Sequence, residues 1–89
     1  MKTPYYSKQF QRDLKLQKKR GKDTGKIKAI LRLLVEEKHF VEKNRDHPLS
    51  GDFSGYRECH IESDWLLIYG IEDNAVYFVR TGTHSDLFG

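Results

Sequence analysis

The side chains best suited to chemistry lie in the second half of the chain. Arg80 comes four residues before His84 in the C-terminal run, and His47, His60 and Asp64 lie upstream. An imidazole titrates near neutral pH, so it can either accept or donate a proton. The planar guanidinium of arginine suits phosphate oxygens. Together these residue types favour acid–base chemistry on a phosphodiester.

Groups of these kinds could cleave an RNA strand without a metal ion. A base must remove the proton of a 2′-hydroxyl, an acid must protonate the departing 5′-oxygen, and a cation must stabilise charge on the phosphorane. A carboxylate such as that of Asp64 can orient an imidazole or act as the base itself. Trp65 and Phe88 could stack an unpaired base, as proteins that hold single-stranded RNA commonly do.

Each of these residues also has a purely structural explanation. His47 could hydrogen-bond within its own turn, and His60 could be a satisfied histidine on a half-exposed strand. Asp64 is a common turn residue, and a single strand tryptophan such as Trp65 usually belongs to the core. We interpret His39 as a surface residue near a helix end and do not include it among the candidates.

No metal site or other cofactor is predicted. Cys59 and His60 are adjacent, so they would point to opposite faces of a strand. The sequence also has no CxxC or HExxH spacing of the kind that binds zinc.

Two helices are predicted in the first half of the chain. Ser7 can cap a helix that runs to about Arg20, with Phe10 and Leu14 on one face and Gly21 as its stop. Thr24 can cap a second helix that fades over 39–43. Its apolar residues follow the i, i+3, i+4, i+7 pattern, namely Ile27, Ile30, Leu31, Leu34 and Val35.

Strands are predicted in the second half, at 56–61, 65–71 and 75–81, after a loop over 44–55. Residues 3–6 could add a further strand, which Pro4 would place at a strand start or a sheet edge. The predicted fold class is α+β, with two N-terminal helices packed on one face of an antiparallel sheet of three to four strands.

Strand alternation allows the candidate residues to converge on one surface. Residues 56, 58 and 60 would share one face of their strand, and residues 76, 78 and 80 would share one face of theirs. The first set ends at His60 and the second at Arg80. His47 could then enter from the loop and His84 from the tail.

The chain is long enough for one domain, spanning 1–89. No apolar run approaches the roughly 20 residues of a membrane-spanning helix, and the N-terminus has no apolar signal-peptide core. A single cysteine allows no internal disulfide, so we expect a cytoplasmic protein.

Charge divides the chain in two. Residues 1–45 contain 14 Lys and Arg against 5 Asp and Glu, a balance of +9, whereas residues 46–89 contain 2 against 8, a balance of −6. The basic half could bind a polyanion such as nucleic acid or an acidic protein, or it could simply be a solvated helix face. Lys15, Lys18 and Lys19 are the candidates for contacts with the phosphates of a nucleic acid.

Several blocks of the sequence resemble the RelE/ParE-like toxins of bacterial type II toxin–antitoxin modules, and most closely their YafQ branch. The resemblance runs through nearly the whole chain. Its most specific blocks are 46–49 (DHPL) with Gly51, 55–61 (GYRECHI), 64–69 (DWLLIY) and 80–88 (RTGTHSDLF). Four blocks in order, with matching separations, are more specific than any one of them.

The resemblance implies a RelE-like fold and a ribosome-dependent mRNA endonuclease that cuts in the A site and inhibits translation. It implies a general acid at His84, with base and orientation from Asp64 together with His60 or His47. Arg80 would stabilise phosphate charge, and Trp65 and Phe88 would hold the mRNA. RelE itself uses more lysine, arginine and tyrosine, but this chain has no lysine after Lys43, which favours the histidine-based mechanism.

The resemblance also implies a neutralising partner, a DinJ-like antitoxin that forms a heterotetramer with the toxin, which is expected to be monomeric alone. An acidic amphipathic segment of this partner could use the apolar stripe of the second helix. Two other function classes remain: a ParE-like inhibitor of DNA gyrase and a non-catalytic RNA-binding module. The set of titratable histidines argues against both.

Overall fold

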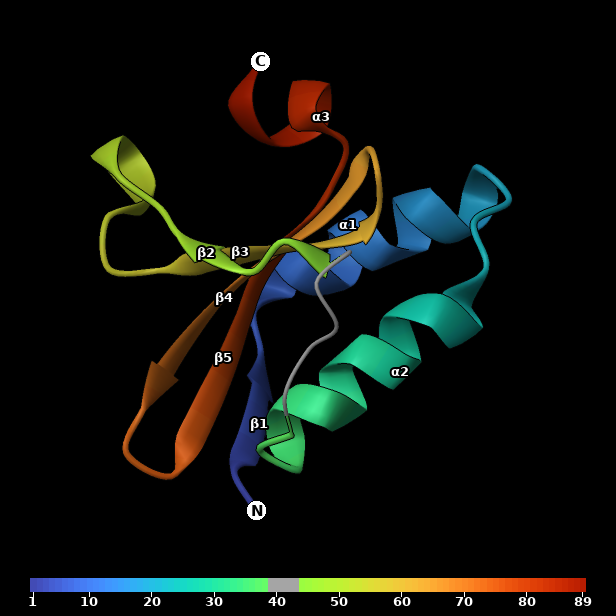
Figure 1. The fold of residues 1–89 in the computed structure, drawn as a ribbon. Coiled ribbons are helices and arrows are strands. Elements are labelled where there is room, and N and C mark those ends of the chain that lie inside the picture. Colours follow the sequence, from blue (N-terminus) through green and yellow to red (C-terminus); the bar gives the residue numbers. More distant parts are fainter. Residues whose placement is uncertain (39–43) are drawn as a thin grey trace.

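A five-stranded mixed sheet forms the centre of the computed structural model, which describes residues 1–38 and 44–89 (Figure 1). The elements follow in the order β1 (Thr3–Tyr6), α1 (Lys8–Lys19), α2 (Thr24–Val35), β2 (His47–Pro48), the 3-10 helix η2 (Gly51–Phe53), β3 (Arg57–Glu62), β4 (Trp65–Glu72), β5 (Ala75–Gly82) and α3 (His84–Phe88). The strand order in the sheet is β1-β5-β4-β3-β2. Strand β1 is parallel to β5, and the other neighbouring strands are antiparallel.

The two long helices begin at side-chain caps. Ser7 accepts a hydrogen bond from the Phe10 backbone N–H (2.9 Å), as predicted. The cap of α2 is Asp23 rather than Thr24, and it accepts from the Gly25 N–H (2.9 Å). Helix α2 ends at Val35, before the predicted fade over 39–43, a segment that lies with His39 outside the described residues.

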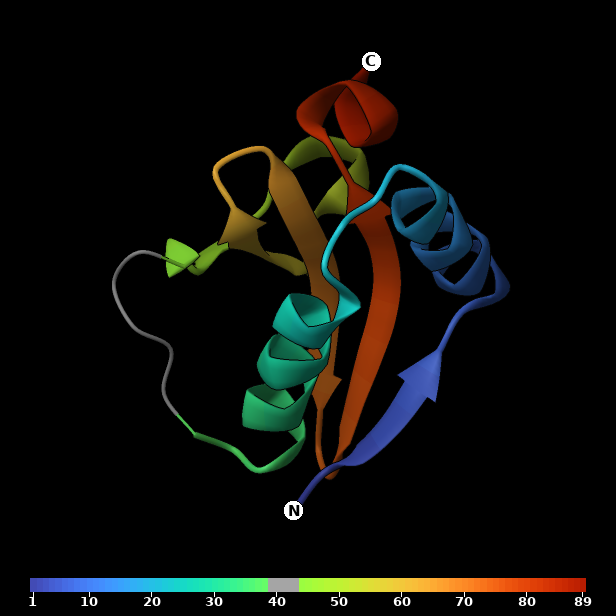
Figure 2. The same cartoon turned by 90° about the vertical axis from the view of Figure 1, so that its right-hand side faces the viewer.

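Both helices contribute to one apolar core on the same side of the sheet. Helix α2 lies in front of the sheet in Figure 2 and α1 lies beside β5. The core joins residues of both helices to β3, β4 and β5, and includes Phe10, Ile27, Ile30, Leu34, Trp65 and Phe78. Three residues of the predicted α2 stripe, Ile27, Ile30 and Leu34, are buried in this core and are not available to a partner. Leu31 and Val35 are only partly buried and line a surface groove, so that part of the expectation is not tested.

The fold class is confirmed, but the structure differs from the prediction in three places. It has five strands, and β1 pairs in parallel with β5 instead of extending an antiparallel sheet. The predicted loop over 44–55 contains β2 and η2. The C-terminal tail forms α3, where Thr83 and Asp86 make a capping box.

A β-bulge changes the face on which Arg80 lies. Ile68 pairs with Arg80 and Tyr69 pairs with Phe78, so Val79 is an extra residue between two paired positions. Arg80 therefore shares the face of Ile68, opposite that of Phe78. The prediction that residues 76, 78 and 80 share one face is wrong, since simple alternation ends at the bulge.

No helix within 1–38 or 44–89 is both long enough and apolar enough to cross a membrane.

Candidate active site

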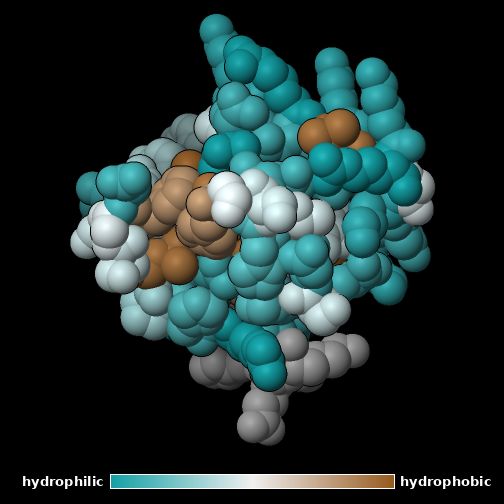
Figure 3. All heavy atoms as spheres, turned by 90° about the horizontal axis from the view of Figure 1, so that it is seen from above, coloured by the Kyte–Doolittle hydropathy of each residue, from teal (hydrophilic) through white to brown (hydrophobic). Residues whose placement is uncertain are grey.

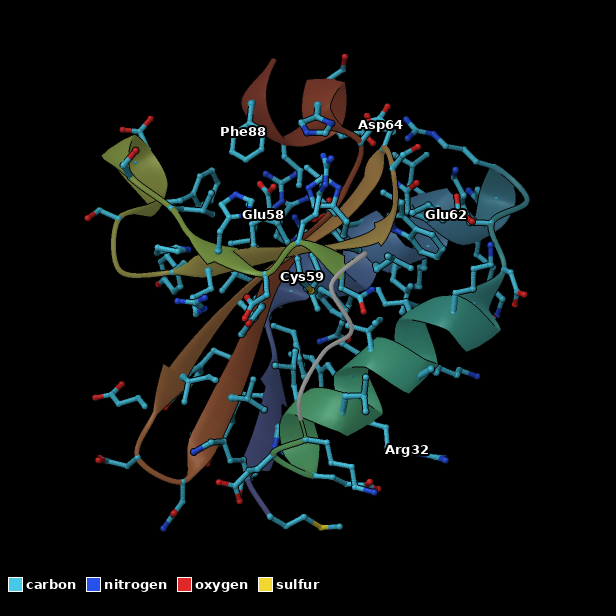
Figure 4. All side chains as sticks on the ribbon, viewed as in Figure 1. Arg32, Glu58, Cys59, Glu62, Asp64 and Phe88 are labelled. Carbon is cyan, nitrogen blue, oxygen red and sulfur yellow. The ribbon has the colours of Figure 1, made fainter. Side chains whose placement is uncertain are left out.

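Residues from four separate segments meet on the sheet face that α1 and α2 do not cover. Strand β3 supplies Glu58 and His60, β2 supplies His47, the β3–β4 turn supplies Asp64, and α3 supplies His84. Glu58 and the neighbouring Cys59 project to opposite sides of β3 (Figure 4). The structure thus brings together all of the predicted histidines and the predicted aspartate.

The carboxylate of Glu58 lies between two imidazoles. Its Oε1 atom is 3.4 Å from His60 Nε2 and 3.5 Å from His47 Nε2. Only 4% of Glu58 is exposed, and a buried carboxylate needs polar partners to offset its lost hydration. Glu58 was missing from the predicted site, although alternation with His60 along β3 placed it on the same face.

His84 is held by Asp64 at two points. Asp64 Oδ1 accepts a hydrogen bond from the His84 backbone N–H (2.9 Å) and lies 2.6 Å from His84 Nδ1. These bonds, the backbone bond first, lower the pKa of Asp64. A charged carboxylate can only accept a hydrogen bond, so Asp64 favours the His84 tautomer that carries its hydrogen on Nδ1. The Nε2 atom of His84 is then free to exchange a proton.

The three imidazoles lie in succession across the site. The ring centroids of His47 and His60 are 6.4 Å apart, and those of His60 and His84 are 5.9 Å apart. His60 is largely buried, whereas the side chains of His47 and His84 are about half exposed. A substrate can therefore reach the two outer rings while the inner ring stays fixed by its surroundings.

Arg80 lies on the site face, but its guanidinium is held by helix α1. Its Nε and Nη2 atoms donate to the two carboxylate oxygens of Asp13, at 2.7 and 3.2 Å. Asp13 also accepts from the Thr81 backbone N–H (3.2 Å). The Asp13 contact raises the pKa of Arg80, which stays charged. Nη1 has no partner within the part of the chain that is described.

The two predicted stacking residues differ in their exposure. Trp65 is fully buried in the core, and its indole N–H donates to Thr81 Oγ1 (2.9 Å). A ring without exposed surface cannot stack a base, so we assign Trp65 to the core. Phe88 is 47% exposed, lies 6.4 Å from the His84 ring and makes an edge contact with Phe53 at 5.8 Å.

A second, smaller apolar cluster supports this side of the sheet. Leu66, Ile68 and Leu87 are its buried members, and the partly buried Leu49, Phe53 and Val79 pack against it. Figure 3 views the molecule from the α3 side and shows hydrophobic areas within a mainly hydrophilic surface. The cluster holds α3, and with it His84, against β4.

The same site could hold a divalent metal ion. Glu58, His60 and His84 each offer a ligand atom within 4.8 Å of the other two. Imidazole and carboxylate ligands suit zinc or copper. The sequence predicted no such set, because its members come from two segments with no recognisable spacing.

Comparison with known proteins identifies the family. A model of the YafQ family, described as a bacterial toxin of type II toxin–antitoxin systems, matches residues 2–89. The chain belongs to this family. The mRNA interferase toxin YafQ of Escherichia coli K12 is 46% identical over 85 residues, which cover 94% of this chain and 92% of that protein.

Solved structures of YafQ toxins share the fold over the whole chain. YafQ from E. coli BL21(DE3) superimposes with a TM-score of 0.95 at 42% identity and complete coverage of both chains. The E. coli DinJ–YafQ complex gives a TM-score of 0.93 at 43% identity, again with complete coverage of both. A metal-bound toxin from Helicobacter pylori gives 0.92 at 40% identity and covers 99% of this chain and 100% of that one.

Proposed function

We propose that this YafQ-family toxin is an endoribonuclease that cleaves mRNA in the ribosomal A site by acid–base attack of the 2′-hydroxyl. The observation that carries the proposal is the arrangement of His84. Its ring is oriented by Asp64, is half exposed, and lies 5.9 Å from His60, which contacts buried Glu58. An oriented acid next to a second imidazole–carboxylate pair is what in-line cleavage of RNA requires.

Each proton transfer has a group that can perform it. His84 Nε2 donates a proton to the departing 5′-oxygen, because Asp64 holds Nδ1 and leaves Nε2 available to the substrate. Glu58 with His60 or His47 takes the proton of the 2′-hydroxyl, and the new bond forms between this oxygen and phosphorus. The products are a 2′,3′-cyclic phosphate and a 5′-hydroxyl, so no proton is gained or lost overall.

Two further residues bind the substrate in this proposal. The Nη1 side of the Arg80 guanidinium stabilises negative charge on the phosphorane, while Asp13 holds the other side of the group. The exposed ring of Phe88, beside His84, stacks a nucleotide next to the cut.

Purified toxin and programmed ribosomes provide the test. Primer extension should reveal cuts in the A-site codon, and mRNA with a 2′-deoxy nucleotide immediately before the cut should remain intact, because its nucleophile is missing. Magnesium stays present in both reactions to preserve the ribosomes. Cutting of the 2′-deoxy mRNA at the unmodified rate would contradict the proposed attack.

We infer that a DinJ-like antitoxin neutralises the toxin, on the support of family membership and of the known DinJ–YafQ complex. The two proteins would form a heterotetramer through antitoxin dimerisation, and the toxin alone would be a monomer. Expression of this chain alone should arrest growth, and co-expression of a neighbouring antitoxin gene should restore it. Equal growth in both cultures would contradict this inference.

A further inference from the structure

A groove lined by tyrosines lies on the sheet beside the candidate active site. Its volume is about 620 Å³, and we call it the tyrosine groove; its principal lining residues are Tyr5, Ser7, Tyr56, Gly70, Tyr77 and Val79. The rings are well exposed for aromatic side chains, at 50% for Tyr5, 38% for Tyr77 and 37% for Tyr56. None of the three tyrosines belongs to the apolar core clusters formed by the described residues, so core packing does not explain them.

Strand pairing arranges the tyrosines in a row across the sheet. Tyr5 pairs with Tyr77, and Tyr77 pairs with Gly70 on the next strand. The Tyr56 ring lies over Gly70, where any Cβ atom would come within 2.9 Å of it. Because Gly70 has no side chain, the Tyr56 ring can pack directly against the β4 backbone at this position. The Tyr5 and Tyr77 rings stack on each other, with centroids 5.1 Å apart and planes at 16°.

This row is continuous with the active site. Two residues further along the strands, Glu58 pairs with Ile68 and Ile68 pairs with Arg80. Alternate residues of a strand share a face and are about 7 Å apart. Tyr56 and Glu58 therefore lie on the same uncovered face, close enough for one RNA strand to contact both. In Figure 1, α1 and α2 lie on the other side of this part of the sheet.

The chemistry of the groove suits bases more than phosphates. Among the described residues that line it, Glu72 is the one with a charge, and it is negative. A phosphate-binding surface would need cations instead. Exposed aromatic rings bind unpaired bases by stacking, and they do so with little dependence on base identity. The stacked Tyr5–Tyr77 pair offers such a surface already in place.

We propose that the tyrosine groove is a second RNA subsite, which stacks unpaired bases of the same strand whose phosphodiester is cut at His84. The proposal rests on the proposed function in that it takes the ligand to be single-stranded RNA. It adds a subsite that holds the substrate without taking part in proton transfer.

A binding experiment with matched variants tests the subsite. The probe is a single-stranded RNA of about ten nucleotides with 2′-deoxy sugars at alternate positions, a length within the range that stacking domains cover. The variants are Tyr5→Ala with Tyr77→Ala, and as control Tyr5→Phe with Tyr77→Phe, which keeps both rings. Loss of stacking should weaken binding by about ten-fold or more in the alanine variant. The phenylalanine variant should bind like the unmodified toxin.

Circular dichroism and thermal unfolding establish that the variants are folded. Tyr56→Ala, immediately before β3, provides an independent change with the same expected loss. In ribosome cleavage, the alanine variant should show a raised KM with kcat nearly unchanged. If it binds the RNA probe normally but loses affinity for the antitoxin, the groove is a protein-binding surface and the proposal is overturned. If the tyrosines control RNA binding but the unmodified toxin cuts no mRNA, the proposed function fails while the subsite stands.

Discussion

The His84 side chain combines the two properties that a general acid needs, a fixed orientation and access to the substrate. Asp64 engages its Nδ1 atom at 2.6 Å, while about half of the side chain stays exposed. His60 lies beside it on the inner side of the site. In the proposed mechanism, the His84 ring donates the proton and Asp64 sets the direction of the ring.

Replacement of His84 by alanine should reduce the single-turnover rate of mRNA cleavage by about 10²–10⁴-fold, the usual contribution of general acid catalysis. The control is Ser85→Ala, an exposed position on the same short helix, which should cleave normally. Far-UV circular dichroism compares the folds of both variants with that of the unmodified toxin. A rate for His84→Ala within a few-fold of the unmodified toxin would contradict the assignment.

Glu58 acts in the proposed mechanism by orienting His47 and His60. Glu58→Gln keeps the shape of the side chain but removes its charge, so cleavage should fall by about 10–100-fold, the range found when carboxylates that orient metal-binding histidines are replaced. The matched control is Glu62→Gln on the same strand, where the carboxylate contacts Lys22 and Lys26 instead. Equal rates for both variants would show that Glu58 has no role beyond packing.

At the scale of elements, α3 carries His84 and is tied to α1 by polar contacts. Asp86 accepts two hydrogen bonds from Arg20, at 2.6 and 3.1 Å, and one from Gln17 at 3.3 Å. It also caps its own helix through Thr83. The buried face of α1 carries two polar side chains in addition to Phe10, namely Asp13 and Gln17. These contacts fix α3 over the sheet.

The Arg20–Asp86 pair should make the toxin sensitive to acid. Arg20, with the Thr83 backbone N–H, lowers the pKa of Asp86, so the pair stabilises the fold at pH values above the unfolded pKa of about 3.9. This contribution is lost as the pH falls below that value toward the folded pKa. Asp86→Asn should therefore lower the Tm near pH 7, and its difference from the unmodified toxin should shrink below about pH 4.

Thermal unfolding at several pH values measures this effect, with Asp52→Asn in η2 as an exposed control. A Tm difference that stays constant from neutral to acid pH would contradict the role of the pair. Cleavage at pH 7 should also fall for Asp86→Asn, because α3 would hold His84 less firmly.

At the scale of the whole molecule, charge and chemistry lie in different halves of the chain. The balance is +9 over residues 1–45 and −6 over residues 46–89, and the candidate active site belongs to the second half. Lys15, Lys18 and Lys19 are all exposed on α1. In the proposed function, this separation would let the basic surface bind the ribosome while the candidate active site meets the mRNA.

Reversal of Lys15, Lys18 and Lys19 to glutamate should weaken association with ribosomes and reduce its dependence on salt, since fewer phosphate contacts release counterions. Reversal of Lys28 and Arg32 on α2 to glutamate is the comparison. It also makes the net charge more negative, but on a different helix, so it shows whether the position of the charge matters. Sedimentation with ribosomes over a series of salt concentrations measures both. An unchanged affinity and salt dependence in the α1 variant would identify this face as merely solvated.

The sequence by itself determined the features that depend on near neighbours in the chain. The Ser7 cap, the apolar spacing of α2 and the hairpin turns are local, so their positions could be predicted to within a few residues. Alternation along β3 also placed His60 on a shared face with Glu58, although the importance of the carboxylate was missed. Residue chemistry singled out the candidate histidines, local patterns placed them on elements, and the family resemblance added their expected roles.

Tertiary structure alone decided which elements meet, because pairing between distant segments leaves no local pattern. The parallel pairing of β1 with β5 joins opposite ends of the chain, and the bulge at Val79 moves Arg80 to the site face. Trp65 is buried because the helices cover its face of β4, which strand alternation cannot reveal. His84 reaches Asp64 because the capping box turns the tail into a helix above the β3–β4 turn. Packing in three dimensions therefore converted a set of suitable residues into a site.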